Sequence, residues 1–368
     1  MCYRRYHMML QKYKLPALIS LVIALFICSP VLAQKYTSEN LFYLVGSPQS
    51  YESFVRNADQ ISIICPAAYD VDQYGVVSGF VDPRVLRLSG EKGIKVMPLV
   101  ASGDQKGIHK LLTDPAARRE AIRLMLFYGS KYHYYGWQLD LENIFFTDRD
   151  NYTSFYRQAA DSLHKYGFKI SMAIVKSDQP APEPGDPSYW RNRYENTRGA
   201  FDIPAIAEAG DFISFMTYDQ NTSLTPPGPV AGIPWMIGMI KYLLSIGVPP
   251  NKISLGIPNY SDYWYPVAYG KEGARSTRSE ISYADAKSLL DEFGAKERWM
   301  KSQQVNYAYW DEGGAFNWLF MENARSFAPK LALVKKYHLR GISVWLLGLG
   351  DPKIWPVLRK EMQTERIN

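Results

Sequence analysis

Cysteine is scarce in this chain. Two of its three cysteines, Cys2 and Cys28, lie in the first 33 residues, which leaves Cys65 alone in the remainder. A single cysteine excludes an internal disulfide, so the fold must be stabilised by its core, in which we expect Cys65 to lie. Histidine is scarce as well. None of the histidines after residue 33 has the spacing of metal ligands, so we expect no metal site.

The apolar run near the start of the chain is short. From Ala17 to Cys28 it spans 12 residues, too few to cross a bilayer as a stable helix. Four basic residues precede it, and the residues up to Ala33 fit a signal-peptidase site. We therefore expect a signal peptide over residues 1–33, a secreted (extracellular or periplasmic) protein and no stable membrane insertion. An uncleaved anchor is the alternative; Ile27 disfavours lipidation at Cys28.

The residues after the expected signal peptide have no large excess of charge of one sign. Lys and Arg fall from 42 to 38 when residues 1–33 are removed, against 36 Asp and Glu, so the net charge falls from +6 to +2. This balance excludes the broad basic footprint of a nucleic-acid-binding protein and a basic membrane-binding patch. Aromatic residues make up 14% of the chain, which suits a large core and equally suits rings that stack on sugars.

Short β-branched runs alternate with helical patterns along residues 34–368. The expected strands are 41–46, 61–67, 95–101, 136–142, 169–175, 211–218, 252–258 and 341–346. Eight strands in a βαβα order predict an α/β fold, and eight parallel strands close a (β/α)8 barrel. A doubly wound open sheet is the alternative, but it would usually carry a glycine-rich phosphate turn after an early strand, which this sequence lacks.

One connection is too long for a simple barrel loop. About 80 residues separate the seventh and eighth strands, and they carry helix and strand signals of their own. We expect a helix over 284–293, strands over 305–310 and 316–321 joined by a hairpin turn at 311–314, and a helix over 326–337. This pattern predicts a small α+β insertion at residues 260–340, beside the mouth of the barrel.

The fourth expected strand, Gly136–Glu142, carries acidic residues on one face. Because side chains alternate along a strand, Gln138, Asp140 and Glu142 share one face, and Trp137, Leu139 and Leu141 share the other. The apolar face must pack on helices, so the polar face points into the barrel, with Glu142 at the catalytic carboxyl end. Two carboxyl groups so close repel, and one should hold a proton near neutral pH, as a general acid must. A half-exposed antiparallel strand is the alternative.

Several short motifs along the chain resemble glycoside hydrolase family 18. Residues 136–142 resemble the second half of its D-G-x-D-x-D-x-E motif, and residues 214–219 resemble its M-x-Y-D segment. Trp345 resembles the tryptophan that floors the family's sugar pocket. Residues 226–230 and 256–260 look like the branch that includes bacterial spore-cortex and peptidoglycan hydrolases. The resemblance covers residues 41–358.

This resemblance implies a retaining, substrate-assisted hydrolase of β-1,4-linked N-acetylglucosamine, in peptidoglycan or a chitin-like chain. Glu142 would be the acid and then the base, Asp140 would hold the acetamido N–H, and Tyr218 would bind the acetamido oxygen. Asp219 would lie beside Tyr218, and Trp345 would stack under the sugar. The mechanism needs no cofactor.

Four further residues complete the expected site. Met216 belongs to the motif of the sixth strand, and Gln138 shares the polar face of the fourth strand. Tyr69 and Tyr260 lie at strand ends, where each ring could stack on sugar or pack in the core. We expect a monomer whose partner is a glycan containing N-acetylglucosamine.

The chain departs from the family pattern at two positions. Tyr135 and Gln138 stand where the motif has its first two aspartates. Gln138 can hydrogen-bond Asp140 but cannot share a proton with it, so we expect an altered pH profile. The branch that resembles the spore-cortex enzymes also has an amide residue at this point, so the change does not by itself imply inactivity.

Two other functions remain open. A non-catalytic sugar-binding protein on the same barrel would usually lack the terminal glutamate, and Glu142 is present. A glycosidase for a glycan without acetamido groups would have no use for Asp140 and Tyr218, whose proposed partners are acetamido atoms.

Overall fold

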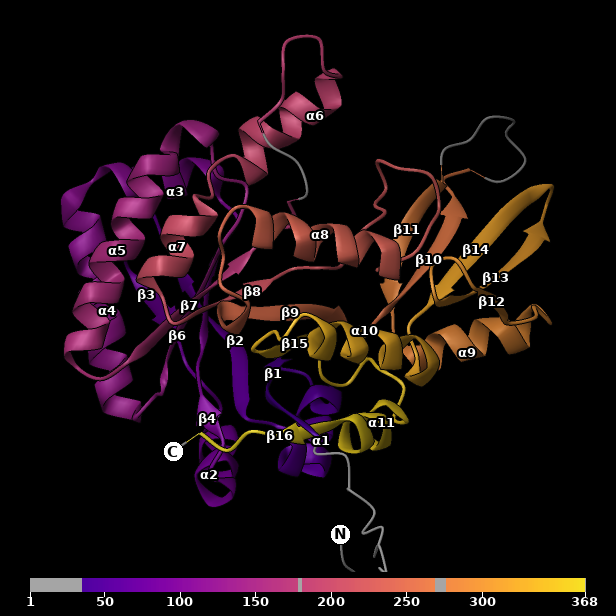
Figure 1. Ribbon diagram of the computed structural model, residues 1–368, viewed down its shortest axis with the longest axis horizontal. Helices are drawn as coiled ribbons and strands as arrows, with labels where there is room; N and C mark the ends of the chain where they lie inside the picture. Colours follow the sequence, from indigo (N-terminus) through magenta and orange to yellow (C-terminus); the bar gives the residue numbers. More distant parts are fainter. Residues whose placement is uncertain (1–34, 178–180, 269–275, 368) are drawn as a thin grey trace, which may run out of the picture. The chain divides into compact units, whose positions relative to one another are not determined.

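The computed structural model describes residues 35–177, 181–268 and 276–367. The expected signal peptide, residues 1–33, lies outside the described residues. Eight parallel strands form the barrel (Figure 1): β1 (Tyr36–Leu44), β2 (Ile63–Val71), β5 (Leu99–Ser102), β6 (Gly136–Leu141), β7 (Lys169–Ile174), β8 (Phe212–Phe215), β9 (Ile253–Pro258) and β15 (Gly341–Trp345). The first strand pairs with both β15 and β2, so the sheet closes and the predicted barrel is confirmed.

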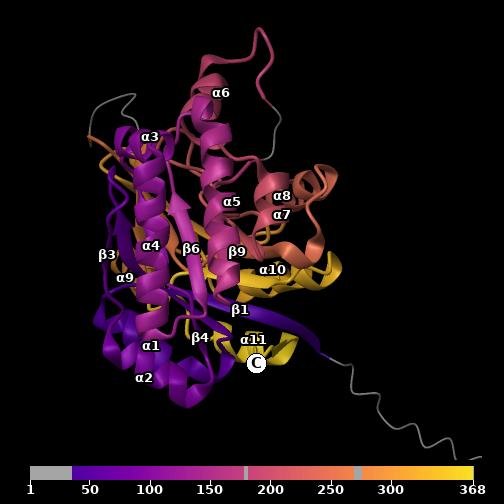
Figure 2. The ribbon, with the colours of Figure 1, turned by 90° about the vertical axis from the view of Figure 1, so that its left-hand side faces the viewer.

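Helices cover the outside of this barrel (Figure 2). They are α1 (Pro48–Asn57), α2 (Pro83–Lys92), α3 (Gln105–Thr113), α4 (Pro115–Tyr132), α5 (Arg149–Lys165), α7 (Ile203–Ala209), α8 (Ile233–Ser245), α10 (Ala324–Lys336) and α11 (Ile354–Glu361). Helix α6 (Ser188–Arg193) has no buried residue and projects beyond the barrel (Figure 1). Single helical turns occur at η1 (Ala58–Gln60), η2 (Phe146–Asp148), η3 (Tyr194–Arg198) and η4 (Pro250–Lys252). Within the described residues, none of the helices has the length and apolar character that a membrane crossing requires.

Local chemistry explains several element bounds. The fourth helix begins at Pro115, where the Asp114 side chain accepts a hydrogen bond from the backbone N–H of Ala116. It ends at Tyr132, and His133 after it adopts a left-handed conformation. The third expected strand is split into β4 (Lys95–Val96) and β5, because Pro98 between them has no N–H to donate. Two short strands, β3 (Val77–Gly79) and β16 (Met362–Thr364), extend the sheet at its ends.

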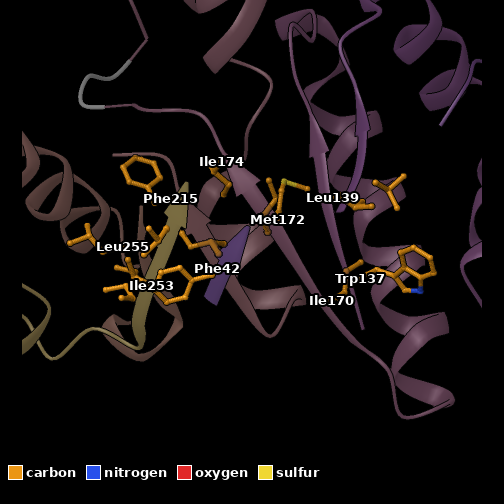
Figure 3. Close-up of a cluster of buried hydrophobic side chains, with 14 of the residues drawn as sticks. Phe42, Trp137, Leu139, Ile170, Met172, Ile174, Phe215, Ile253 and Leu255 are labelled. Carbon is orange, nitrogen blue, oxygen red and sulfur yellow. The ribbon is translucent and has the colours of Figure 1, made fainter. Parts of the chain in front are cut away.

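The alternation along β6 has the predicted orientation. Trp137 and Leu139 belong to the apolar layer between strands and helices, together with Met172 of β7 and Phe215 of β8 (Figure 3). The indole N–H of Trp137 donates to the backbone oxygen of Met125 on α4 at 3.1 Å. The polar residues of β6 therefore point into the barrel.

A polar layer crosses the barrel interior at the level of Gln138. Its side-chain oxygen accepts from the Tyr43 hydroxyl at 2.6 Å, and its amide nitrogen donates to the hydroxyls of Ser171 and Ser214 at 2.8 and 2.9 Å. Ser343 of β15 continues the network to Ser214 at 2.8 Å. This layer satisfies the buried amide and forms a rigid base directly beneath the carboxyl end of β6.

The segment that connects β9 to β15 in the sequence forms a second sheet, as expected for an α+β insertion. Its strands are antiparallel, in the order β11 (Ser276–Ile281), β10 (Ser261–Pro266), β14 (Ala315–Met321), β13 (Val305–Glu312) and β12 (Arg298–Met300). Helix α9 (Tyr283–Glu292) packs on it. The predicted hairpin is present: Gly313 and Gly314, both with positive φ, join β13 to β14.

A buried ion pair joins this sheet to the barrel. Glu322 follows β14, Lys330 lies in α10, and their side chains form a salt bridge at 5% and 0% exposure. Helix α10, expected within the insertion, packs on β13 of the second sheet and also on α8, α11, β9 and β15 of the barrel.

We expect Lys330→Met to lower the free energy of unfolding by about 3–5 kcal/mol, because it leaves the Glu322 carboxylate buried without its cation. The double variant Glu322→Gln/Lys330→Met should recover most of that loss. Urea unfolding of the three proteins tests this, and a single variant as stable as the wild type would contradict it.

Candidate active site

Two carboxyl groups occupy the carboxyl end of β6. Asp140 lies on the inward face of the strand, and Glu142 follows its last residue, with its backbone N–H bonded to the oxygen of Ser102 at 3.0 Å. The parallel pairing of β6 with β5 and β7 fixes the height of both side chains. In a barrel of this kind, this end holds the reactive groups.

The buried position of Asp140 favours its protonated form. Burial, and then the charge of Glu142, raise the pKa of Asp140 to about 7. Its Oδ1 atom is buried and has no hydrogen-bond partner among the described residues. Gln138 was expected to bond Asp140, but its amide groups are bound to Tyr43, Ser171 and Ser214 instead. The unpartnered oxygen is therefore available to a donor from outside the chain.

Glu142 is the second carboxyl group with a perturbed pKa. Burial raises the pKa of Glu142, the negative charge of Asp219 raises it further, and the positive charge of Lys176 opposes both effects. The side chain lines an open cleft together with Lys176, Arg193, Met216, Tyr218 and Asp219. A raised pKa in an open cleft is what a general acid near neutral pH requires.

Asp219 is held from two sides. The residue has a φ of 56°, and its Oδ1 atom accepts from the Tyr260 hydroxyl at 2.8 Å and from the Arg278 guanidinium at 2.7 Å. Arg278 lies on β11 of the second sheet and also binds Asp262 on β10 at 2.6 Å. The insertion thus supplies the cation that neutralises Asp219 beside the cleft.

A cluster of aromatic side chains forms another part of the site. Tyr218 packs edge-on against Tyr260, with ring centroids 6.4 Å apart, and belongs to one apolar cluster with Met216 and Trp345. Trp345 also meets the Tyr43 ring edge-on at 5.1 Å. Burial raises the pKa of the Tyr218 hydroxyl well above its usual value, which keeps it a neutral donor.

The structure brings most of the expected site residues together. Glu142, Met216, Tyr218 and Asp219 line one cleft. The half-buried Trp345 and the buried Tyr260 pack with Tyr218, and Asp140 lies close enough to Glu142 for the charge of Glu142 to raise its pKa. Gln138 lies one layer deeper, inside the barrel.

Tyr69 lies elsewhere. Its hydroxyl bonds the Tyr134 hydroxyl at 2.9 Å, and its ring meets Trp137 at 5.0 Å in the outer apolar layer. The register of β2 against β5 shifts between Ala67 and Tyr69, and this irregularity turns the ring away from the interior. Tyr69 is therefore a packing residue.

Three charged residues near the cleft were not expected from the sequence. Lys176 follows β7, Arg193 ends α6, and Arg278 reaches Asp219 from the second sheet. The sequence offers no local motif for any of them. A position just after a barrel strand was the one sequence feature that could have placed such a residue at the site, and only Lys176 has that position.

The closed barrel with an acidic pair at the end of its fourth strand is that of a glycoside hydrolase. The family model "Glycosyl hydrolases family 18" matches residues 37–350. The chain belongs to this family and is a glycoside hydrolase, whose substrate is a glycan.

Individual relatives agree with this assignment. The "Uncharacterized glycosylase YvbX" of Bacillus subtilis is 24% identical over 86% of this chain and 90% of that protein. The "Cortical fragment-lytic enzyme" of the same organism is 31% identical over 67% of this chain, which spans 54% of that protein. Among solved structures, the spore cortex-lytic enzyme SleL of Bacillus megaterium superposes with a TM-score of 0.79 at 20% identity, over 91% of this chain and 76% of that one.

Asp140→Asn is expected to stabilise the fold more at pH 8 than at pH 4. The pKa of Asp140 in the folded chain is about 7, against an ordinary 3.8, so wild-type stability falls as the pH rises through this interval. Asparagine has no such proton to lose. The free energy of unfolding of the Asn variant minus that of the wild type should therefore grow by about 2–4 kcal/mol from pH 4 to pH 8.

Urea unfolding from pH 4 to pH 8 measures this difference. The exposed Asp161→Asn, on α5, serves as the matched control and should show no growth. A difference for Asp140→Asn that does not change with pH would contradict the burial argument.

Proposed function

We propose that the chain is a secreted, retaining glycosidase that hydrolyses a polysaccharide containing β-1,4-linked N-acetylglucosamine, by substrate-assisted catalysis. The observation that carries the proposal is the half-buried pair Asp140 and Glu142, one with a buried, unpartnered oxygen and the other open to a cleft. Both have a raised pKa, about 7 for Asp140, so the surroundings of each favour its protonated form.

Glu142 acts as the acid in the first step. Its proton passes to the glycosidic oxygen, the bond between that oxygen and the anomeric carbon breaks, and the acetamido oxygen of the same sugar attacks the anomeric carbon. The product is an oxazolinium ion, with the leaving chain released as an alcohol. In the second step the Glu142 carboxylate takes a proton from water, which opens the ring with net retention of configuration.

Asp140 and Tyr218 bind the acetamido group. The free Oδ1 of Asp140 accepts the acetamido N–H, and the carboxylate offsets the positive charge of the oxazolinium ion. The neutral Tyr218 hydroxyl donates to the acetamido oxygen and directs it at the anomeric carbon. Asp219, fixed by Tyr260 and Arg278, supports this arrangement.

Trp345 and Met216 supply an apolar surface for the sugar ring. They pack with Tyr218 and Tyr260 in one cluster, and Trp345 remains partly exposed. A flat indole beneath a pyranose ring stabilises the bound sugar without fixing its hydroxyl pattern.

Peptidoglycan is the favoured glycan, and a chitin-like chain is the alternative. The name of the cortical fragment-lytic relative points to a cell-wall glycan, whereas other solved neighbours are chitinases. A non-catalytic sugar-binding role is the second candidate function, and the retention of Glu142 in the cleft argues against it.

Glu142→Gln should lower kcat on N-acetylglucosamine oligomers and on purified peptidoglycan by about 10²–10⁴-fold, because the amide cannot supply a proton. The exposed Glu91→Gln, on α2, is the matched control and should retain activity. The wild type should release the β-anomer from a β-linked substrate, as followed by NMR of fresh product.

An initial α-anomer would contradict the substrate-assisted mechanism. A wild type that binds these glycans but cleaves none of them would instead support the sugar-binding role.

A further inference from the structure

The cleft beside Glu142 contains two cations that the mechanism above does not use. Lys176 follows β7, and Arg193 is the last residue of α6; both line the cleft. Figure 2 shows β6 pointing toward the end of the barrel at which α6 lies. The Nζ atom of Lys176 is buried and has no hydrogen-bond partner among the described residues. A buried ammonium without a partner is costly.

Neither cation is neutralised by a carboxylate in the described part of the chain. The acidic neighbour Asp219 is already bound by Arg278 and Tyr260. Arg193 donates to the Tyr189 hydroxyl at 3.1 Å and lies over the same ring, so its partner is neutral. The other carboxyl group of the cleft, Glu142, must be protonated to start the reaction, and it then adds no negative charge.

These charges do not suit a neutral glycan. A polymer of N-acetylglucosamine alone offers hydroxyl and amide groups, which do not compensate the desolvation of an ammonium as a carboxylate does. An alternating glycan of N-acetylglucosamine and N-acetylmuramic acid carries a lactyl carboxylate on every second sugar. Such a group would bring the missing negative charge into the cleft when the substrate binds.

We propose that Lys176 and Arg193 bind the carboxylate of an N-acetylmuramic acid residue across the scissile bond from the sugar held by Asp140 and Tyr218. This inference rests on the proposed function and makes its substrate specific: the chain prefers a glycan that carries free lactyl carboxylates. Glu142 lies between the two sugars because it protonates the oxygen that joins them. Lys176 and Arg193 are then specificity-determining residues.

Two matched substrates test the inference. One is a glycan strand of alternating N-acetylglucosamine and N-acetylmuramic acid, freed of peptide; the other is the same strand with its lactyl carboxylates converted to neutral methylamides. The wild type should hydrolyse the acidic strand with a kcat/KM about tenfold or more above that for the neutral strand. Lys176→Met and Arg193→Met should each lower this ratio about tenfold.

Controls separate charge recognition from other effects. The exposed Lys241→Met, on α8, should keep the wild-type ratio. Binding of both strands to Glu142→Gln, with and without Lys176→Met, measures recognition in the absence of turnover, and the added substitution should weaken binding of the acidic strand selectively.

Three outcomes would decide against the inference or its basis. A wild-type ratio near one overturns it. An equal loss on both strands in Lys176→Met also overturns it, and would make Lys176 a residue that acts on Glu142 alone. If the wild type cleaves neither strand, the proposed function fails, while the binding comparison still decides whether the cations recognise the carboxylate.

Discussion

The site depends on holding two partly buried carboxyl groups close together at the end of one strand. Asp140 lies on β6 and Glu142 follows its last residue, and both are held by the pairing with β5, through Ala101 and the backbone oxygen of Ser102. Burial raises the pKa of both groups; the charge of Glu142 raises that of Asp140 further, and the charge of Asp219 raises that of Glu142. The closed barrel stabilises this arrangement, because the helices bury its outer face and the Gln138 layer supports it from within.

The second sheet contributes to the same electrostatics. Arg278 reaches from β11 to Asp219 and is itself held by Asp262, so the charge beside Glu142 depends on the position of the insertion. The buried pair of Glu322 and Lys330 joins that sheet to α10 of the barrel. The insertion is therefore part of the active site as well as a wall beside it.

Strand periodicity was enough to predict the barrel and the orientation of its fourth strand. The strict alternation of residues 136–142 predicted the inward face of β6, and the eight-strand order predicted the barrel. The strands β10 and β11 were not predicted: β10 follows β9 with almost no turn signal, and β11 is a short polar run that resembles a surface loop.

Some contacts could not be settled from the sequence, because tertiary partners decide them. Gln138 was expected to bond its strand neighbour Asp140, but three residues from other strands bind its amide. An irregularity in β2 turned Tyr69 outward, and single-strand alternation cannot reveal it. Arg278 lies 59 residues from Asp219 in sequence, so no local pattern could have joined them.

The most direct test of the central claim is a titration of the Asp140 carboxyl carbon by NMR, in the wild type and in Glu142→Gln. The account predicts an apparent pKa near 7 in the wild type, which falls when the charge of Glu142 is removed but stays above the ordinary value because the group is buried. A carboxyl group that titrates at its ordinary value in both proteins would contradict the account.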